Sequence, residues 1–282
     1  MELLTSLEQL QAFNQQRSPQ QTVGFVPTMG YLHAGHLSLV KAANQQCDLT
    51  LVSIFVNPSQ FGPNEDLSAY PRDLDRDLAM LAEYKVDYVF FPDVQMMYPP
   101  GYKTWITVQE LTDTFCGASR PGHFTGVATV VLKLVNLVRP HLMFMGEKDY
   151  QQIVILETML RDLNLPARIV RCPIVREPDG LAMSSRNAYL SETERSQALC
   201  LYNALSLARM LYTAGERNIT ILKAQMTALI EQSGGKPDYI AFVDKDTLEE
   251  VESPADNTRI LLAVHIGRTR LIDNASICDN YR

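Results

Sequence analysis

The chain has 282 residues, of which 46% are hydrophobic and 20% charged, values that are ordinary for a folded globular protein of one large domain or two smaller ones. Its net charge of -7, from 32 acidic against 25 basic residues, argues against a surface that binds long nucleic acid. Five widely spaced cysteines without a CxxC pair predict neither a disulfide framework nor a thiolate zinc site, and they fit a reducing compartment. Because the N-terminal MELLTSLEQL lacks a basic stretch and the apolar runs are far shorter than a membrane span, we expect a cytoplasmic protein without a membrane partner.

Short apolar segments rich in β-branched residues alternate with longer segments of helical periodicity over residues 1–175. This alternation is typical of βαβ units, so we expect an α/β domain with a parallel sheet. The expected strands are Thr22–Pro27, Leu49–Val56, Asp87–Phe91, Leu142–Met145 and Ala167–Val175. The expected helices are His36–Asn44, Leu74–Glu83, Val127–Leu137 and Gln151–Leu163.

The pattern changes after Val175, where an EPDG turn and a polar MSSRN segment precede a long helical stretch from Glu192 to Thr213. We therefore expect a second domain over residues 176–282. Its predicted strands are Tyr239–Asp244, Arg259–Ile266 and Thr269–Asp273, the last two joined through a Gly-Arg turn. The Gln-rich segment 9–21 is expected to form a solvated helix and loop.

The strongest local motif is PTMGYLHAGHLSLV, residues 27–40, where the first predicted strand ends and the first predicted helix begins. Ligands of doubly wound sheets bind at the carboxyl ends of the strands, and a helix N-terminus offers N–H groups and a positive dipole to phosphate. His33 and His36 are three residues apart and share one side of the first helical turn. Gly30 and Gly35 let the backbone approach a ligand closely. The motif predicts a phosphate site that contains no lysine.

The same pair of histidines is also compatible with two packed or surface side chains. A zinc site would need a third ligand, and the other histidines lack HExxH spacing (His123, His141 and His265). The sequence contains neither the GxxxxGK[ST] motif of a P-loop nor the GxGxxG motif of a dinucleotide-binding site, so neither kind of site is predicted.

Three further polar clusters follow predicted strands or lie near the domain boundary. Asn57 and Gln60, in SIFVNPSQFG, offer neutral amides to a small polar substrate, or else form a solvated turn. Lys148 and Asp149, in MGEKDYQQ, are suited to phosphate and to ribose hydroxyls, or else form a surface charge pair. Arg186, in AMSSRN, is suited to bidentate phosphate binding, or else belongs to a polar loop that caps the next helix.

Together these segments give the chain a close resemblance to the pantothenate synthetase family, whose members join pantoate to β-alanine with ATP. The resemblance runs nearly end to end, through VPTMGYLHAGH, VSIFVNPSQF, YPRDLDRDL, ASRPGHFTGV, MGEKDYQQ with Met145 in place of the common Phe, PIVREPDGLAMSSRNAYLS and RLIDN. The HxGH sequence alone indicates only the wider nucleotidyltransferase superfamily, which includes class I aminoacyl-tRNA synthetases and small-molecule adenylyltransferases.

The resemblance implies a Rossmann-like, doubly wound N-terminal domain that binds ATP and pantoate, a smaller C-terminal α+β lid domain, and a homodimer. It implies ATP with Mg²⁺ as cosubstrate and a pantoyl-adenylate intermediate, which the β-alanine amine attacks to release AMP. HAGH matches the superfamily's HxGH, and MSSR stands in place of the mobile KMSKS-type loop. The donors expected to stabilise phosphate charge during catalysis are His33, His36, Lys148 and Arg186.

The resemblance also assigns binding residues. Those implied to contact ATP are Met29, Gly30, Tyr31, Leu32, His33, Ala34, Gly35, His36, Gly146, Glu147, Lys148, Asp149, Val175, Met183, Ser184, Ser185 and Arg186. Pantoate is assigned to Gln60 and Gln152, with Gln60 also near β-alanine and Asn57 in the same pocket. Asp77 is a candidate Mg²⁺ ligand, although Arg76 interrupts the acidic run and a solvated helix face is the alternative. Residues 116–126 are a candidate lid over the substrates.

Two other functions remain open. One is another small-molecule adenylyltransferase acting on a phosphorylated acceptor, against which SQF and KDYQQ argue. The other is a non-catalytic ATP sensor that uses the same fold to switch a partner. A tRNA synthetase is disfavoured by the acidic balance and by the lack of a further domain to hold tRNA.

Overall fold

The computed structural model describes residues 1–63 and 65–278 and divides into two compact units. Unit 1 comprises Met1–Glu147 and Ile155–Pro173. Unit 2 comprises Lys148–Val154 and Ile174–Arg282, of which 279–282 lie outside the described residues. We expected one boundary, after residue 175, whereas the chain passes into unit 2 twice because the start of one helix packs with the later segments.

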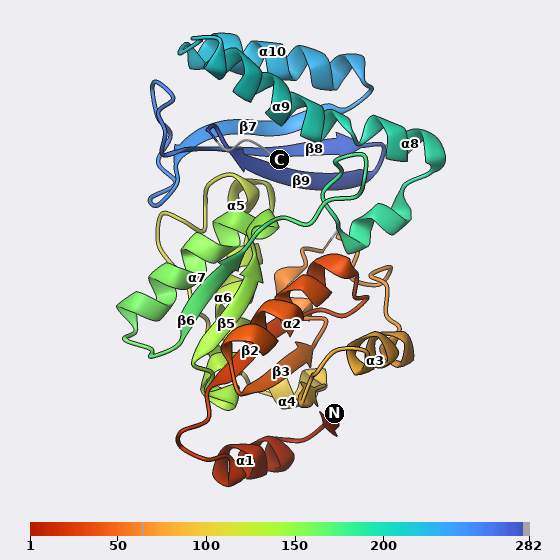
Figure 1. The fold of residues 1–282 in the computed structure, drawn as a ribbon, viewed down its shortest axis with the longest axis vertical. Helices are drawn as coiled ribbons and strands as arrows, with labels where there is room; N and C mark the ends of the chain where they lie inside the picture. The colour runs from red at the N-terminus through yellow and green to blue at the C-terminus, as the bar shows by residue number, and fades with distance from the viewer. Residues whose placement is uncertain (64, 279–282) are drawn as a thin grey trace. The chain divides into compact units, whose positions relative to one another are not determined.

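Unit 1 is built on a parallel sheet whose strands run in the order β1-β4-β3-β2-β5-β6. Figure 1 labels the neighbouring strands β3, β2, β5 and β6. The strands are β1 Glu2–Leu4, β2 Val23–Thr28, β3 Leu49–Ile54, β4 Tyr88–Phe90, β5 Leu142–Gly146 and β6 Arg168–Cys172. From β2 the chain winds outward through β3 and β4 and then returns to add β5 and β6 on the other side. The order therefore reverses between β2 and β5, which confirms the expected doubly wound α/β fold and places its switch point there.

The helices of unit 1 connect these parallel strands, as β–α–β crossovers require. They are α1 Leu7–Gln16, α2 Ala34–Gln46, α3 Leu74–Ala82, α4 Val94–Met97, α5 Cys116–Ser119, α6 His123–Val138 and α7 Tyr150–Asp162, the last starting in unit 2. Two 3₁₀ turns, η1 Pro58–Gln60 and η2 Glu147–Asp149, follow β3 and β5. One face of the sheet packs against α2 and α3 through a core that includes Val26, Val52 and Phe144, all fully buried. This core fixes the carboxyl ends of β2 and β3, which carry the site.

Unit 2 has an antiparallel sheet of β7 Lys236–Asp244, β8 Thr258–Ile266 and β9 Thr269–Ser276. Helices α9 Cys200–Thr213 and α10 Ile219–Gln232 cover one face of it (Figure 1). The predicted β8–β9 hairpin is confirmed, with Gly267 at a φ of 55° in the turn. The single long helix predicted from Glu192 is wrong, because α8 Glu192–Gln197 ends before α9 begins. A third 3₁₀ turn, η3 Ser185–Tyr189, precedes α8.

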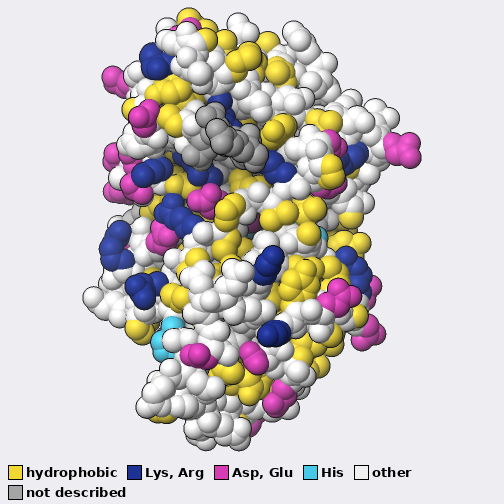
Figure 2. Space-filling view, viewed as in Figure 1, with side chains coloured by type: hydrophobic (Ala, Val, Ile, Leu, Met, Phe, Trp, Pro, Cys, Tyr) yellow, Lys and Arg dark blue, Asp and Glu magenta, His cyan; other side chains and the backbone are white. Residues whose placement is uncertain are grey.

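The surface agrees with the ordinary composition. Figure 2 shows Lys and Arg side chains interspersed with Asp and Glu on the face that it draws. Within residues 1–63 and 65–278, none of the helices combines the length and the apolar character needed to cross a membrane.

Candidate functional site

The loop between β2 and α2 has a specific backbone conformation. Gly30 and Tyr31 both have positive φ, 81° and 50°, which only glycine adopts without strain. A Cβ at Gly30 would also lie 3.0 Å from a carboxylate oxygen of Asp77. The Thr28 hydroxyl accepts the Gly30 N–H at 3.2 Å and donates to the carbonyl of Ser53 on β3 at 2.8 Å. The carboxyl ends of the two central strands therefore hold the start of the loop.

The two histidines of the loop form the N-terminal cap of α2. His33 Nδ1 accepts the Gly35 N–H at 3.1 Å, and His36 Nδ1 accepts the His33 N–H at 3.3 Å. Their ring centroids are 4.1 Å apart. A ring nitrogen that accepts a hydrogen bond carries no proton, so each neutral imidazole has its proton on Nε2. Both rings are thereby held as Nε2–H donors beside the N-terminus of α2.

Asp77, on the first turn of α3, supports the same loop. Its side chain is 1% exposed, and its two oxygens accept the N–H groups of Tyr31 and Leu32, each at 2.7 Å. The Arg76 guanidinium lies over the Tyr31 ring at 4.9 Å. Burial raises the pKa of Asp77, although the two backbone N–H groups and Arg76 oppose this shift. The carboxylate thus fixes the residues between Gly30 and the histidine cap.

The turn after β3 carries two buried amides. Asn57 is 1% exposed and Gln60 is 9% exposed. Asn57 Nδ2 donates to Gln60 Oε1 at 3.1 Å and to the Gly126 carbonyl at 3.2 Å. A Cβ at Gly126 would lie 2.4 Å from the Ser59 carbonyl, so only glycine allows α6 to approach η1 this closely. Gln60 Nε2 is 3.0 Å from the sulfur of Met29, a weak acceptor on the loop after β2.

The segment predicted as a lid packs against this turn. His123 Nδ1 lies 2.8 Å from the Gln60 carbonyl, and its Nε2 lies 3.1 Å from Arg120 Nη1. Since the carbonyl only accepts and the guanidinium only donates, the proton of the ring is on Nδ1. Arg120 also forms an ion pair with Glu65 at 2.5 Å. Although burial acts to raise it, the pKa of Glu65 is held below its ordinary value by the Arg120 guanidinium.

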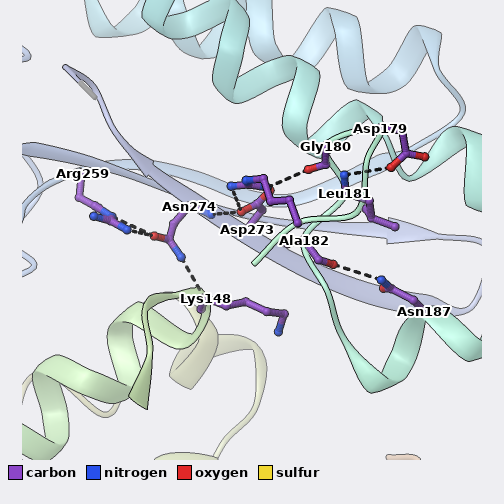
Figure 3. Close-up of polar contacts among 10 residues, drawn as sticks. Lys148, Asp179, Gly180, Leu181, Ala182, Asn187, Arg259, Asp273 and Asn274 are labelled. Atoms are coloured by element: carbon purple, nitrogen blue, oxygen red, sulfur yellow. Dashed lines mark hydrogen bonds and ion pairs between the residues drawn. The ribbon is translucent and has the colours of Figure 1, made fainter. Parts of the chain in front are cut away.

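Unit 2 positions Lys148 through its main chain. The Lys148 carbonyl accepts a hydrogen bond from Asn274 Nδ2 at 3.0 Å, while Asn274 Oδ1 accepts from Arg259 Nε at 2.8 Å (Figure 3). Arg259 lies over the Tyr150 ring at 4.2 Å, and the Tyr150 hydroxyl donates to the Lys245 carbonyl at 2.8 Å. The Lys148 ammonium is 3.6 Å from the Asp149 carboxylate, and its side chain is 21% exposed. The β9 strand therefore fixes the backbone from which this cation extends.

The MSSR segment follows a short hairpin that is anchored by an ion pair. Arg176 Nη1 and Asp273 Oδ2 are 2.6 Å apart, with side-chain exposures of 10% and 1%. Arg176 Nη1 also donates to the Gly180 carbonyl at 3.0 Å. At the far end, Asn187 Nδ2 donates to the Ala182 carbonyl at 3.1 Å, and the Ser184 hydroxyl caps η3. The hairpin before residues 183–186 is thus anchored on β9, and the residues that flank this segment are joined to each other.

Comparison with known proteins places this architecture in one family. The family model described as pantoate-beta-alanine ligase matches residues 2–276. The chain is 56% identical over 254 residues to a pantothenate synthetase of Caldicellulosiruptor saccharolyticus, covering 90% of each protein. It is 50% identical over 276 residues to that of Thermotoga petrophila, covering 97% of this chain and 99% of the relative. The chain belongs to the pantoate-beta-alanine ligase family.

Solved structures agree with this assignment. The pantothenate synthetase of Thermus thermophilus superposes with a TM-score of 0.91 at 43% identity, over 99% of this chain and all of that one. The pantoate-beta-alanine ligase of Francisella tularensis, complexed with beta-gamma ATP and beta-alanine, has a TM-score of 0.84 at 37% identity, over 98% of both chains. The protein is therefore a ligase, as its sequence motifs predicted.

Most of the predicted site residues of the ligase lie at strand ends, and the contacts of two of them bear on the roles predicted for them. Asn57 donates to Gln60 Oε1 and to the Gly126 carbonyl, so it supports the Gln60 amide, while its contact with a substrate stays a prediction. Asp77 is not on a solvated helix face, and both its oxygens accept backbone N–H groups, which does not fit a Mg²⁺ ligand. Among the described residues, no group of three or more His, Cys, Asp or Glu side chains is placed to hold a metal ion.

The structure also adds residues that sequence reasoning missed. Tyr98 donates to Asn57 Oδ1 at 2.9 Å from 41 positions along the chain. Asn274 supports Lys148 from a distance of 126 residues. Only the RLIDN motif, which contains Asn274, signalled the second contact, and the YPPG segment around Tyr98 gave no signal for the first.

Proposed function

We propose that this ligase condenses pantoate with β-alanine at the expense of ATP, through a pantoyl-adenylate. The observation that carries the proposal is the pair of imidazoles held as Nε2–H donors at the N-terminus of α2, at the switch point of a doubly wound sheet. Such a terminus favours phosphate through its N–H groups and its dipole. The family relatives and the motifs at the ends of β3 and β5 supply the substrate class.

The reaction balances without a covalent enzyme intermediate. A pantoate carboxylate oxygen attacks the α-phosphorus of ATP, the bond to the β-phosphate oxygen breaks, and pyrophosphate leaves. The β-alanine amine then attacks the carbonyl carbon of the mixed anhydride, AMP leaves with the bridging oxygen, and the amine loses a proton. Because the substrates provide both nucleophiles, the protein's task is to position them and to stabilise phosphate charge.

We assign charge stabilisation to His33, His36, Lys148 and Arg186, the donors that the family resemblance implies. ATP binding extends over Met29–His36, Gly146–Asp149, Val175 and Met183–Arg186, as the resemblance predicts. ATP enters as its Mg²⁺ complex. No described side chain is assigned to that ion, since both oxygens of Asp77 accept hydrogen bonds from the N–H groups of Tyr31 and Leu32.

We assign pantoate to Gln60 and Gln152, and place β-alanine near Gln60. Neutral amides hydrogen-bond hydroxyl and carboxylate oxygens without adding a fixed charge beside the reacting carboxylate. The protein acts as a homodimer in the cytoplasm, with no nucleic-acid or membrane partner. The expectation of a dimer comes from the family resemblance, and that of the cytoplasm from the spacing of the five cysteines, the N-terminal sequence and the shortness of the apolar runs.

The test is release of pyrophosphate and AMP from ATP. With pantoate alone, a stoichiometric burst of pyrophosphate is expected, and β-alanine should then start steady production of AMP. Turnover with a phosphorylated acceptor and none with pantoate would favour the other adenylyltransferase, whereas ATP binding without any turnover would favour the sensor.

The His36→Ala variant tests the phosphate donors. Loss of one preorganised donor should slow adenylation by roughly 10² to 10³. The control is His265→Ala, which changes the same residue type on β8 and should leave the rate within a factor of about two. Equal rates for the two variants would contradict the role of His36.

The MSSR segment is proposed to close on ATP and shield the adenylate from water. Amide exchange over residues 182–188 should slow when a non-hydrolysable ATP analogue binds, and Arg186→Ala should reduce this protection. Unchanged exchange with and without the analogue would remove the closing step.

A further inference from the structure

A chain of hydrogen bonds, half-buried at Tyr98 and buried at Asn57, leads from Tyr98 to the Gln60 amide. The Tyr98 hydroxyl donates to Asn57 Oδ1 at 2.9 Å, and Asn57 Nδ2 donates to Gln60 Oε1 at 3.1 Å. The Ser59 hydroxyl also reaches Asn57 Oδ1, at 2.9 Å. Because Asn57 is 1% exposed, these contacts exchange little with water.

The orientation of the Asn57 amide is determined by its neighbours. The Gly126 carbonyl can only accept, so the atom 3.2 Å from it must be Nδ2. On the other side, the Ser59 N–H, at 3.3 Å, can only donate and so requires Oδ1. Tyr98 adds a hydroxyl donor to the same oxygen. Asn57 therefore presents a donor, and not an acceptor, to Gln60.

This donor fixes the Gln60 amide in turn. With Oε1 engaged by Asn57, the amide must turn Nε2 the other way, where its observed contact is the Met29 thioether at 3.0 Å. A thioether is a weak acceptor that an anionic oxygen readily replaces. An inverted amide would present an acceptor to that position and would repel a carboxylate.

We infer that Asn57 and Tyr98 are positioning residues that hold Gln60 with its Nε2 donor toward an oxygen atom of the substrate. The inference rests on the proposed function, in which that substrate is pantoate. It gives Asn57 a role through Gln60, and it makes the remote Tyr98 hydroxyl part of substrate selection.

The surroundings of Tyr98 keep its hydroxyl in place. Its ring stacks on Trp105 with centroids 5.9 Å apart and meets Tyr102 edge-on at 5.1 Å. The Lys133 ammonium lies 5.9 Å from the Tyr98 ring and 4.6 Å from the Tyr102 ring. Burial raises the pKa of Tyr98, so the phenol stays protonated and remains a donor at neutral pH.

Asn57→Asp tests the orientation with almost no change in shape. It replaces the donor facing Gln60 by an acceptor, so Gln60 should rotate and offer Oε1 to the substrate. The KM for pantoate should rise by about tenfold or more, while the KM for ATP should stay within about twofold. In a Gln60→Ala background, Asn57→Asp should add less than about twofold to the pantoate KM, because no amide remains to be turned.

Tyr98→Phe tests the hydroxyl without a buried charge, and it decides the matter should the aspartate variant fail to fold. Tyr98→Phe should raise the pantoate KM by about three- to tenfold, and Tyr102→Phe, which alters the same aromatic cluster, should not. This effect should also vanish in the Gln60→Ala background.

The outcomes distinguish an error in the pantoate assignment of Gln60 from an error in the positioning roles of Asn57 and Tyr98. If the Gln60→Ala variant has the same KM for pantoate as the wild type, Gln60 does not bind pantoate, and both the proposed function's assignment and the inference are wrong. A raised KM in Gln60→Ala, combined with fully additive effects of Asn57→Asp and Tyr98→Phe, would overturn the inference alone. If Tyr98→Phe and Tyr102→Phe have equal KM values for pantoate, the Tyr98 hydroxyl has no part in positioning Gln60.

Discussion

Removing the Asp77 carboxylate should loosen the loop that carries the two histidines. In Asp77→Ala, the N–H groups of Tyr31 and Leu32 lose acceptors at 2.7 Å. Leu32 is 1% exposed, so water replaces its lost bond poorly, whereas Tyr31 is half-buried and is partly rehydrated. Tyr31 also has a φ of 50°, a conformation that needs support from its neighbours.

The size of the effect follows from these two groups. A buried N–H without an acceptor costs about 1–3 kcal/mol, and the half-buried group costs less. Burial raises the pKa of Asp77, which means that its buried charge is itself unfavourable and that removing it offsets part of the loss. We therefore expect the free energy of unfolding of unit 1 to fall by about 2 kcal/mol.

The assay is denaturant unfolding without ATP or Mg²⁺, together with the KM for ATP. Asp75→Ala is the matched control, since it removes an exposed carboxylate from the same first turn of α3 and should change stability by less than about 0.5 kcal/mol. Asp77→Ala should raise the KM for ATP as well. If Asp77→Ala unfolds like Asp75→Ala and its activity returns at high Mg²⁺, the carboxylate is a metal ligand and our reasoning is refuted.

Four further predictions test other parts of the molecule. Lys148→Ala should slow adenylation without changing the unfolding midpoint, since its backbone carbonyl still accepts from Asn274; a changed midpoint and an unchanged rate would contradict this. Gln152→Ala should weaken pantoate binding more than ATP binding in a titration, and the reverse order would overturn its assignment. Glu65→Gln should be less stable than the parent at neutral pH. Because the pKa of Glu65 is lowered in the folded protein, the difference should shrink as the pH falls below the ordinary value of 4.5 and be lost once the pH passes the lowered folded-state pKa; a difference that persists in stronger acid would count against the ion pair. Burial raises the pKa of Cys200 to about 11, so a thiol reagent at mildly alkaline pH should modify the exposed Cys278 well before Cys200, and equal rates would contradict the packing of unit 2.

The sequence predicted the helices and strands whose pattern of apolar residues follows directly from which of their faces are buried. β2 and β3 are apolar along their length because both faces of the central sheet are covered, and both were found within two residues of their ends. The helix α10 was missed, because its buried Leu222, Met226 and Ile230 make only a narrow apolar stripe. The three-residue strand β1 was missed because so short a segment carries no periodicity.

Some residues of the candidate site were likewise predictable from the sequence, and others were not. His33, His36 and Gln60 were found because they stand at the ends of strands, a position that local sequence reveals. The support of the site was not found, since Asp77, Tyr98 and Asn274 act on residues 41 to 126 positions away. The pattern of apolar and polar residues in one sequence does not show which distant side chain will contact a given loop.

The measurement that tests the central claim most directly is transfer of ¹⁸O from the pantoate carboxylate. In the two-step reaction, the attacking carboxylate oxygen becomes the bridge to the α-phosphorus and leaves with AMP. Pantoate labelled in both carboxylate oxygens should therefore yield AMP with one ¹⁸O per pantothenate formed, as measured by mass spectrometry. Unlabelled AMP, or label in inorganic phosphate with ADP as the nucleotide product, would contradict a pantoyl-adenylate and with it the account of this site.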